Sequence, residues 1–82
     1  MIMGNREKLK QLLTDIFLLD PSEFRFDLSR EQVETWDSLA VVSVAVGVHE
    51  TFGYHPTPEE ATAIKSVPDI IALLESKGIK FD

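Results

Sequence analysis

Few residues of this 82-residue chain could take part in covalent or acid–base chemistry. The chain has no cysteine, so any sulfur chemistry must come from an attached group. Its only histidines are His49 and His55. The most informative candidate is Ser38, because it follows the acidic Asp37 and stands directly before a long apolar run that begins at Leu39. The hydroxyl of Ser38 is therefore the first group whose role needs an explanation.

Ser38 stands where a helix is expected to begin. Asp37 is a good N-cap residue, because its carboxylate can accept hydrogen bonds from the free N–H groups of a first helical turn. Ser38 then lies in that turn, near the positive end of the helix dipole, where a phosphate group is favoured. The pattern fits a phosphate-bearing serine, and it also fits a plain capped helix with a serine on its surface.

Ser38 has no evident activating partner in the sequence. His49 lies eleven residues further along, which in a helix is a rise of about 16 Å and too far for a general base. A serine hydrolase that activates its own nucleophile is therefore not favoured. His49, Glu50 and His55 are poorly spaced for a metal site, and we expect no metal. Ser38 fits better as the substrate of a separate enzyme.

Three motifs follow one another along the chain: Asp37-Ser38-Leu39, then Val48-His49-Glu50-Thr51-Phe52-Gly53, then Ser66-Val67-Pro68-Asp69-Ile70-Ile71 with Gly78 beyond it. Over nearly the whole chain they resemble the acyl carrier protein family, the phosphopantetheine-attachment domains. The resemblance implies that a phosphopantetheinyl transferase transfers a 4′-phosphopantetheine arm from coenzyme A to Ser38. It further implies that the protein is not an enzyme. Acyl groups would be carried on the arm as thioesters between synthases, ligases and transferases of fatty acid, lipid or polyketide biosynthesis.

The resemblance also assigns roles to the neighbours of Ser38. Asp37 would help present the serine to the transferase, and Leu39 would be an apolar contact for partner enzymes, with core packing as the alternative. The helix after Ser38 is apolar nearly all round, so we expect one side to line a space for the acyl chain and the other to meet partners. Gly47 would either enlarge that space or allow close helix packing. The candidate partner or acyl-chain contacts are Trp36, Ala40, Val42, Val46, Gly47 and Glu50.

The chain departs from the family pattern along this helix. Ala40, Ser43 and His49 stand where acidic residues are common in carriers of fatty acid synthases, and only Glu50 is retained nearby. Basic partners would gain less electrostatic steering, which indicates a specialised carrier. Trp36 before the motif is similar to some aminoacyl or peptidyl carriers, so that cargo stays open, although we favour a large apolar anchor at the base of the bundle. An acidic four-helix interaction module without an arm is the alternative from a different class.

A first helix is expected over residues 5–19. Asn5 could cap it, and it should stop before Pro21, whose ring disfavours a helical Asp20. Its buried face recurs at spacings of three and four and comprises Leu9, Leu12, Leu13, Ile16 and Phe17.

A long connection follows over residues 20–36. Structureless loops of this length are uncommon in compact domains, so its apolar residues should hold it against the core, with a short helical turn at 22–24. These residues are Phe24, Phe26, Leu28, Val33 and Trp36.

The stretch after Ser38 is ambiguous by pattern alone. Valines at every second position from 42 to 48 favour a strand, and Gly47 costs a helix roughly 1 kcal/mol relative to alanine. The family resemblance implies a helix over 38–52, and the cap at Asp37 and a stop at Gly53 agree with it. We therefore expect a helix whose packing overrides the local preference.

Two further helices are expected over 58–64 and 67–77. Thr57, Pro58 and Glu60 form a capping box with proline at the first helical position. Ser66 can cap the last helix, and Lys77 and Gly78 suit its end. The fold expected is an all-α four-helix bundle, with three longer helices, one short helix and a long first loop, in a single domain over 1–82.

The net charge of −6 disfavours nucleic acid and anionic membranes as partners, and it favours proteins with basic faces. Residues 1–10 do not resemble a signal peptide, and no stretch reaches the roughly 20 apolar residues of a membrane span. We expect a cytoplasmic monomer that does not insert into membranes.

Overall fold

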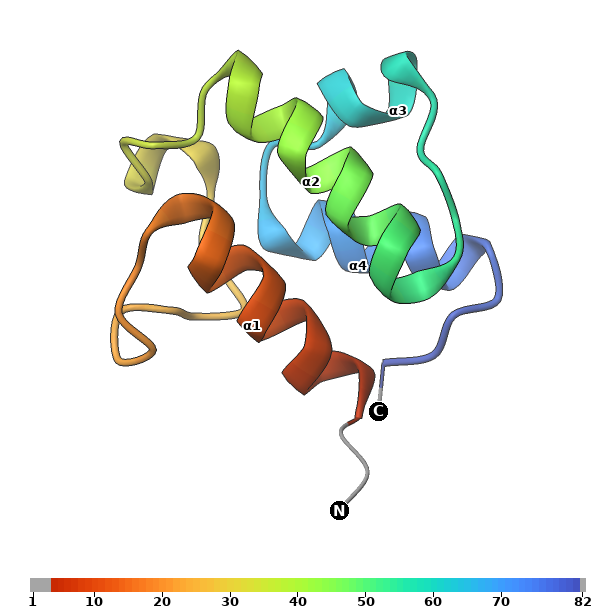
Figure 1. The fold of residues 1–82 in the computed structure, drawn as a ribbon, viewed down its shortest axis with the longest axis horizontal. Helices are drawn as coiled ribbons and strands as arrows, with labels where there is room; N and C mark the ends of the chain where they lie inside the picture. The colour runs from red at the N-terminus through yellow and green to blue at the C-terminus, as the bar shows by residue number, and fades with distance from the viewer. Residues whose placement is uncertain (1–3, 82) are drawn as a thin grey trace.

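A computed structural model describes residues 4–81 and places four α-helices in a bundle (Figure 1). They are α1 (Asn5–Phe17), α2 (Ser38–Phe52), α3 (Pro58–Ala63) and α4 (Val67–Ser76). A short 3₁₀-helix, η1 (Arg30–Gln32), lies in the long connection between α1 and α2. Residues 1–3 and 82 lie outside the described residues. Residues 1–3 belong to the segment 1–10 that does not resemble a signal peptide, and all four belong to the expected domain over 1–82.

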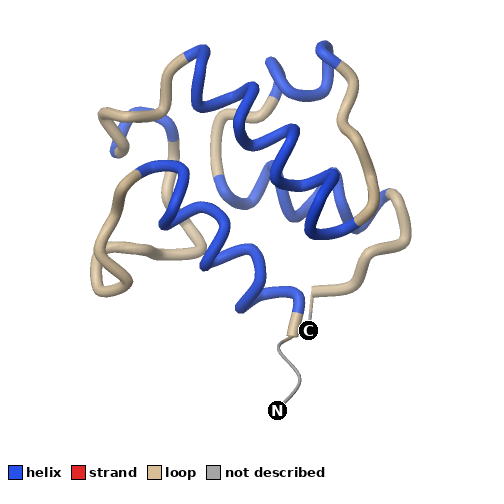
Figure 2. Tube along the Cα trace, in the orientation of Figure 1, coloured by secondary structure: helices blue, strands red, loops and turns tan. Residues whose placement is uncertain are grey.

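Helices and connecting loops make up all of the described chain, without a strand (Figure 2). The one extended pairing within residues 4–81 is an isolated antiparallel bridge between Ser29 and Ser66. The predicted all-α bundle, with three longer helices and one short helix, is therefore confirmed.

Helix α1 differs from its prediction at both ends. Its N-cap residue is Gly4, and Asn5 is the first helical residue, so the predicted cap at Asn5 is wrong. The Asn5 amide instead donates to the Lys80 carbonyl at 2.7 Å, which ties the start of α1 to the C-terminal segment. The helix ends at Phe17, two residues earlier than expected, because Leu18 adopts a left-handed conformation with φ of 56°.

Residues 38–52 form the helix α2, although their alternating valines favour a strand. Asp37 caps the start of α2, and Gly53 ends it in the left-handed region with φ of 81°. The buried side chains lie on one face, which packs on α1 and α3, and comprise Ala40, Val44, Ala45 and Val48. Burial of this face outweighs the mild helix penalty of valine, since tertiary contacts routinely override propensity.

The connection between α1 and α2 is held against the core, as expected. Phe24, Leu28, Val33 and Trp36 are buried, and Phe26 is partly buried. Residues 21–23 form a turn and not a helical segment, and the helical part is η1 further along.

Backbone hydrogen bonds fix η1 onto the link between α3 and α4. The Arg30 N–H donates to the Lys65 carbonyl at 2.8 Å, and the Val67 N–H donates to the Leu28 carbonyl at 2.8 Å. These long-range bonds place η1 beside the start of α2 and the end of α3.

The caps predicted for α3 and α4 are confirmed. Thr57 Oγ1 accepts from the Glu60 N–H at 3.1 Å, and Glu60 Oε1 accepts from the Thr57 N–H at 3.0 Å. Ser66 Oγ accepts from the Asp69 N–H at 3.1 Å. Within residues 4–81, none of the helices has the length and apolar character needed to cross a bilayer.

Candidate functional site

Ser38 is the first residue of α2, and its side chain is exposed. Asp37 Oδ1 accepts from the Ala40 N–H at 2.9 Å, so the carboxylate caps the helix as expected. The first N–H groups of a helix lack partners within it and carry partial positive charge. The Ser38 hydroxyl is therefore presented to solvent at an end of α2 that favours negative charge.

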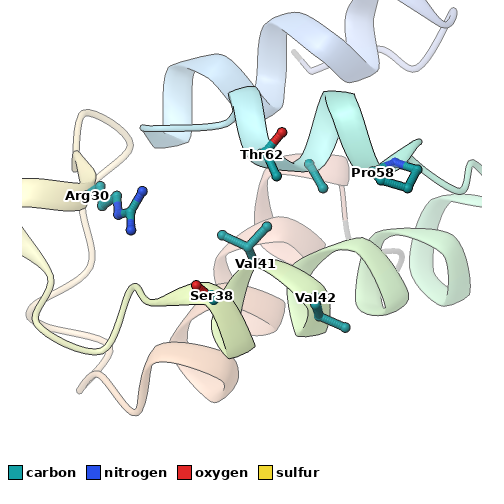
Figure 3. Close-up of a pocket in the computed structure, with 7 residues that line it drawn as sticks. Arg30, Ser38, Val41, Val42, Pro58 and Thr62 are labelled. Carbon is teal, nitrogen blue, oxygen red and sulfur yellow. The ribbon is translucent and has the colours of Figure 1, made fainter.

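A half-open pocket of about 300 Å³ lies directly beside Ser38. It is enclosed by η1 and by the facing sides of α2 and α3, and Val41 points across it toward α3 (Figure 3). The residues that line it are Arg30, Ser38, Val41, Val42, Pro58, Ala61 and Thr62. Apolar walls with a few polar groups at the rim are typical of small-molecule sites, and the volume is at the lower end of their range.

A second, narrower cavity lies behind this pocket. Its walls are Trp36, Val41, Val44, Ala61 and Ile64, and it has no room for a water molecule. Val41 and Ala61 line both spaces, so this pair separates the outer pocket from the inner cavity. The inner space therefore adjoins the outer pocket at Val41 and Ala61, and packed side chains close it.

The Glu60 side chain holds one wall of the pocket in place. Its carboxylate accepts from the Tyr54 hydroxyl and the Thr57 N–H, and Lys77 Nζ lies 3.5 Å from Oε2. The hydrogen bond from Tyr54 lowers the pKa of Glu60 below its ordinary value, and the same bond raises the pKa of Tyr54. These contacts tie α3, which supplies Pro58, Ala61 and Thr62 to the pocket, to its neighbours.

The structure divides the predicted contact residues into exposed and buried groups. Leu39, Val42 and Val46 are 78%, 60% and 44% exposed, and Glu50 is exposed as well. Trp36 and Ala40 are buried, so neither offers a surface to a partner enzyme. Burial of Trp36 agrees with the apolar-anchor interpretation, and its ring stacks on Phe17 with centroids 4.7 Å apart.

Gly47 does not line the pocket. A Cβ built on it would overlap Cδ1 of Leu12 on α1 and lie 3.3 Å from the Leu12 Cγ. Of the two alternatives for this glycine, the structure therefore favours close helix packing and not an enlarged acyl space.

Four residues line the pocket beside Ser38 although the sequence did not indicate them as site candidates: Arg30, Pro58, Ala61 and Thr62. They lie 8 to 24 positions from Ser38, and no local motif connects them to it. The capping box correctly predicted that a helix begins at Pro58, but the period of so short a helix does not reveal which face meets α2. The tertiary fold alone brings these side chains to Ser38.

The two histidines lie at the other end of α2. Their rings contact each other edge to face with centroids 5.1 Å apart. Within residues 4–81, no three His, Asp or Glu side chains come together as a metal site would require. His49 is about three helical turns from Ser38 along α2, so it is not placed as a base for that hydroxyl.

The fold and the site define a small helical bundle that exposes one serine at a helix N-terminus, beside an apolar pocket. The chain is 30% identical over 71 residues to an acyl carrier protein from Thermosynechococcus vestitus, which covers 87% of this chain and 88% of the relative. It is 29% identical over 70 residues to an acyl carrier protein from Coprothermobacter proteolyticus, covering 85% of each chain.

A third acyl carrier protein, from Bdellovibrio bacteriovorus, is 28% identical over 76 residues, covering 93% of this chain and 97% of the relative. No protein-family model matches the chain. The relatives span almost its whole length, and the chain belongs to the acyl carrier protein family.

Proposed function

We propose that this protein carries acyl groups as thioesters on a 4′-phosphopantetheine arm attached to Ser38, and that it catalyses no reaction by itself. The observation that carries the proposal is the exposed Ser38 hydroxyl at the start of α2, next to a pocket with apolar walls. The absence of cysteine agrees with it, because the thiol that holds the cargo would come from the arm.

Attachment of the arm would make Ser38 the nucleophile of a separate phosphopantetheinyl transferase. The Ser38 Oγ attacks the β-phosphorus of coenzyme A, a new O–P bond forms, and the bridging P–O bond breaks to release adenosine 3′,5′-bisphosphate. The transferase supplies Mg²⁺ and the base that takes the serine proton. The start of α2 favours the charge of the new phosphodiester, and Arg30 adds a cation, since its side chain extends from η1 toward the same pocket (Figure 3).

The acyl chain would enter the pocket between α2 and α3. Val41, Val42, Pro58 and Ala61 provide hydrocarbon contacts there, and burial of apolar surface stabilises a bound chain by roughly 25 cal/mol for each Å² removed from water. The thioester would be shielded from water while the protein moves between enzymes.

Partner enzymes would contact the exposed side of α2. Leu39, Val42 and Val46 form an apolar stripe there, and Glu50, one turn further along, adds a single charge at its end. Binding through such a stripe depends weakly on ionic strength, whereas acidic carrier surfaces gain from steering by basic partners. This surface fits a specialised lipid, polyketide or acyl-modification pathway, and an aminoacyl or peptidyl cargo is the second candidate because of Trp36 before the motif.

Incubation with coenzyme A and a broad-specificity phosphopantetheinyl transferase tests the attachment. We expect intact-protein mass spectrometry to show a gain equal to the arm, which Ser38→Ala abolishes. Ser43→Ala, another exposed serine on α2, is the matched control and should be modified like the wild type. A folded protein that gains no mass would contradict the proposal and favour an interaction module without an arm.

A further inference from the structure

Trp36 carries a buried hydrogen-bond donor without a partner. The residue is 3% exposed, and its indole Nε1 is buried and makes no hydrogen bond within residues 4–81. It is also the only tryptophan of the chain. Native structures satisfy the large majority of buried side-chain polar atoms, so an orphaned donor calls for a specific explanation.

The surroundings of the indole do not allow it to find a partner by itself. Its ring is stacked on Phe17. The backbone N–H of Trp36, as distinct from the indole N–H, donates to the Val33 carbonyl at 3.1 Å. The stacking restrains the ring, and the backbone hydrogen bond restrains the main chain that bears it. The cavity that Trp36 lines is otherwise bounded by hydrocarbon side chains, namely Val41, Val44, Ala61 and Ile64, and it is too narrow for water.

A hydrogen-bond acceptor could reach this cavity from the outer pocket. Val41 and Ala61 line both spaces and so lie between them, and the inference requires that a bound chain displaces the Val41 side chain. Ser38, where the cargo is tethered under the proposed function, lies at the mouth of the outer pocket. A chain that enters from Ser38 therefore meets Val41 first and the indole ring behind it.

We propose that the indole N–H of Trp36 determines cargo specificity, by favouring acyl chains that carry an oxygen acceptor over fully saturated chains of the same length. An oxo or hydroxyl oxygen on the chain would accept the hydrogen bond that the folded protein leaves unmade. A saturated chain would keep the donor buried without a partner. The inference rests on the proposed carrier function, because the cargo must be tethered at Ser38.

The single tryptophan makes the test specific, because the protein gives one indole ¹H–¹⁵N resonance. The protein is loaded at Ser38 with hydrolysis-resistant, amide-linked pantetheine analogues bearing octanoyl, 3-oxooctanoyl or 5-oxooctanoyl chains. We expect the indole proton to move downfield with at least one oxo chain relative to octanoyl. We also expect the ratio of buried to solvent-exposed chain to be about fivefold higher for the oxo chain than for octanoyl. One added hydrogen bond has roughly this effect on an equilibrium constant.

Trp36→Phe supplies the matched variant, because phenylalanine keeps an aromatic ring on Phe17 and removes the N–H. In this variant the preference for the oxo chain should disappear, while retention of octanoyl stays the same. An indole resonance that is identical with all three chains in the wild type would overturn the inference, even if Trp36→Phe does not fold. Failure of the carrier function has a different signature, namely that none of the analogues attaches to Ser38.

Discussion

Alanine at position 47 should reveal how tightly α1 and α2 pack. An added Cβ would overlap Cδ1 of Leu12 and lie 3.3 and 3.4 Å from its Cγ and Cδ2. Leu12 is only partly buried, so its side chain has some freedom to move away. Gly47→Ala therefore sets the intrinsic helix preference of alanine against a local steric clash.

The two effects have comparable size and opposite sign. Alanine in place of glycine stabilises a helix interior by roughly 1 kcal/mol, and overpacking a core contact costs about 1–3 kcal/mol. We expect Gly47→Ala to lower the free energy of unfolding by roughly 0–2 kcal/mol, which in a domain of this size is a fall in Tm of up to about 16 °C. In a Leu12→Ala background the clash is removed, and Gly47→Ala should then stabilise by about 1 kcal/mol.

A double-mutant cycle measured by urea denaturation separates the two effects. The expected coupling energy between positions 12 and 47 is about 1–3 kcal/mol, which is within the range found for residues in contact. If Gly47→Ala stabilises the wild type as much as it stabilises Leu12→Ala, the two side chains do not compete for space, and close packing at Gly47 is refuted. Arm attachment at Ser38 should be unaffected in all variants, because Gly47 does not line the pocket.

Three further predictions concern the site and the wall of its pocket. Asp37→Ala should lower the free energy of unfolding by about 1 kcal/mol through loss of the N-cap, whereas Asp37→Asn should keep most of it, and equal urea midpoints for all three proteins would contradict the cap. Glu60 has a lowered pKa in the folded protein, so its contribution to stability is present above the pKa of the unfolded chain and is lost as the pH falls through the lower folded value. Glu60→Gln should therefore flatten the decline of Tm below about pH 4.5, the ordinary pKa of glutamate. An unchanged dependence of Tm on pH in this acidic range would count against the Tyr54–Glu60 hydrogen bond. In protein bearing the arm, Arg30→Gln should shift the ³¹P resonance of the phosphodiester, and Arg30→Lys should shift it less. Arg25→Gln is the control, because it removes a guanidinium that is paired with Asp27 outside the pocket, and it should leave the resonance unchanged. Identical spectra for the two glutamine variants would exclude a role of Arg30.

Local signals in the sequence determined where three of the four described α-helices begin. Asp37, Thr57 and Ser66 each cap a helix through a hydrogen bond to a backbone N–H three residues further on. Such bonds need only near neighbours, so the residue types reveal them directly. Asn5 is the exception, because its side chain finds an acceptor 75 residues away in the Lys80 carbonyl.

The local sequence pattern could not predict whether the segment after Ser38 forms a strand or a helix. Alternating valines favour a strand, and only the burial of one face of α2 against α1 and α3 makes the helix preferable. The family resemblance pointed to the correct answer because it carries information about the whole fold.

The sequence alone indicated Ser38, Asp37 and the apolar residues that follow as candidates, because they are contiguous. Only the tertiary structure placed Arg30 at the pocket, turned Gly47 toward Leu12, and buried the indole of Trp36 with its donor unpaired. Each of these depends on contacts between segments far apart in the chain. Such contacts follow from the packing of the whole bundle, and hydrophobic periodicity within one helix does not specify them.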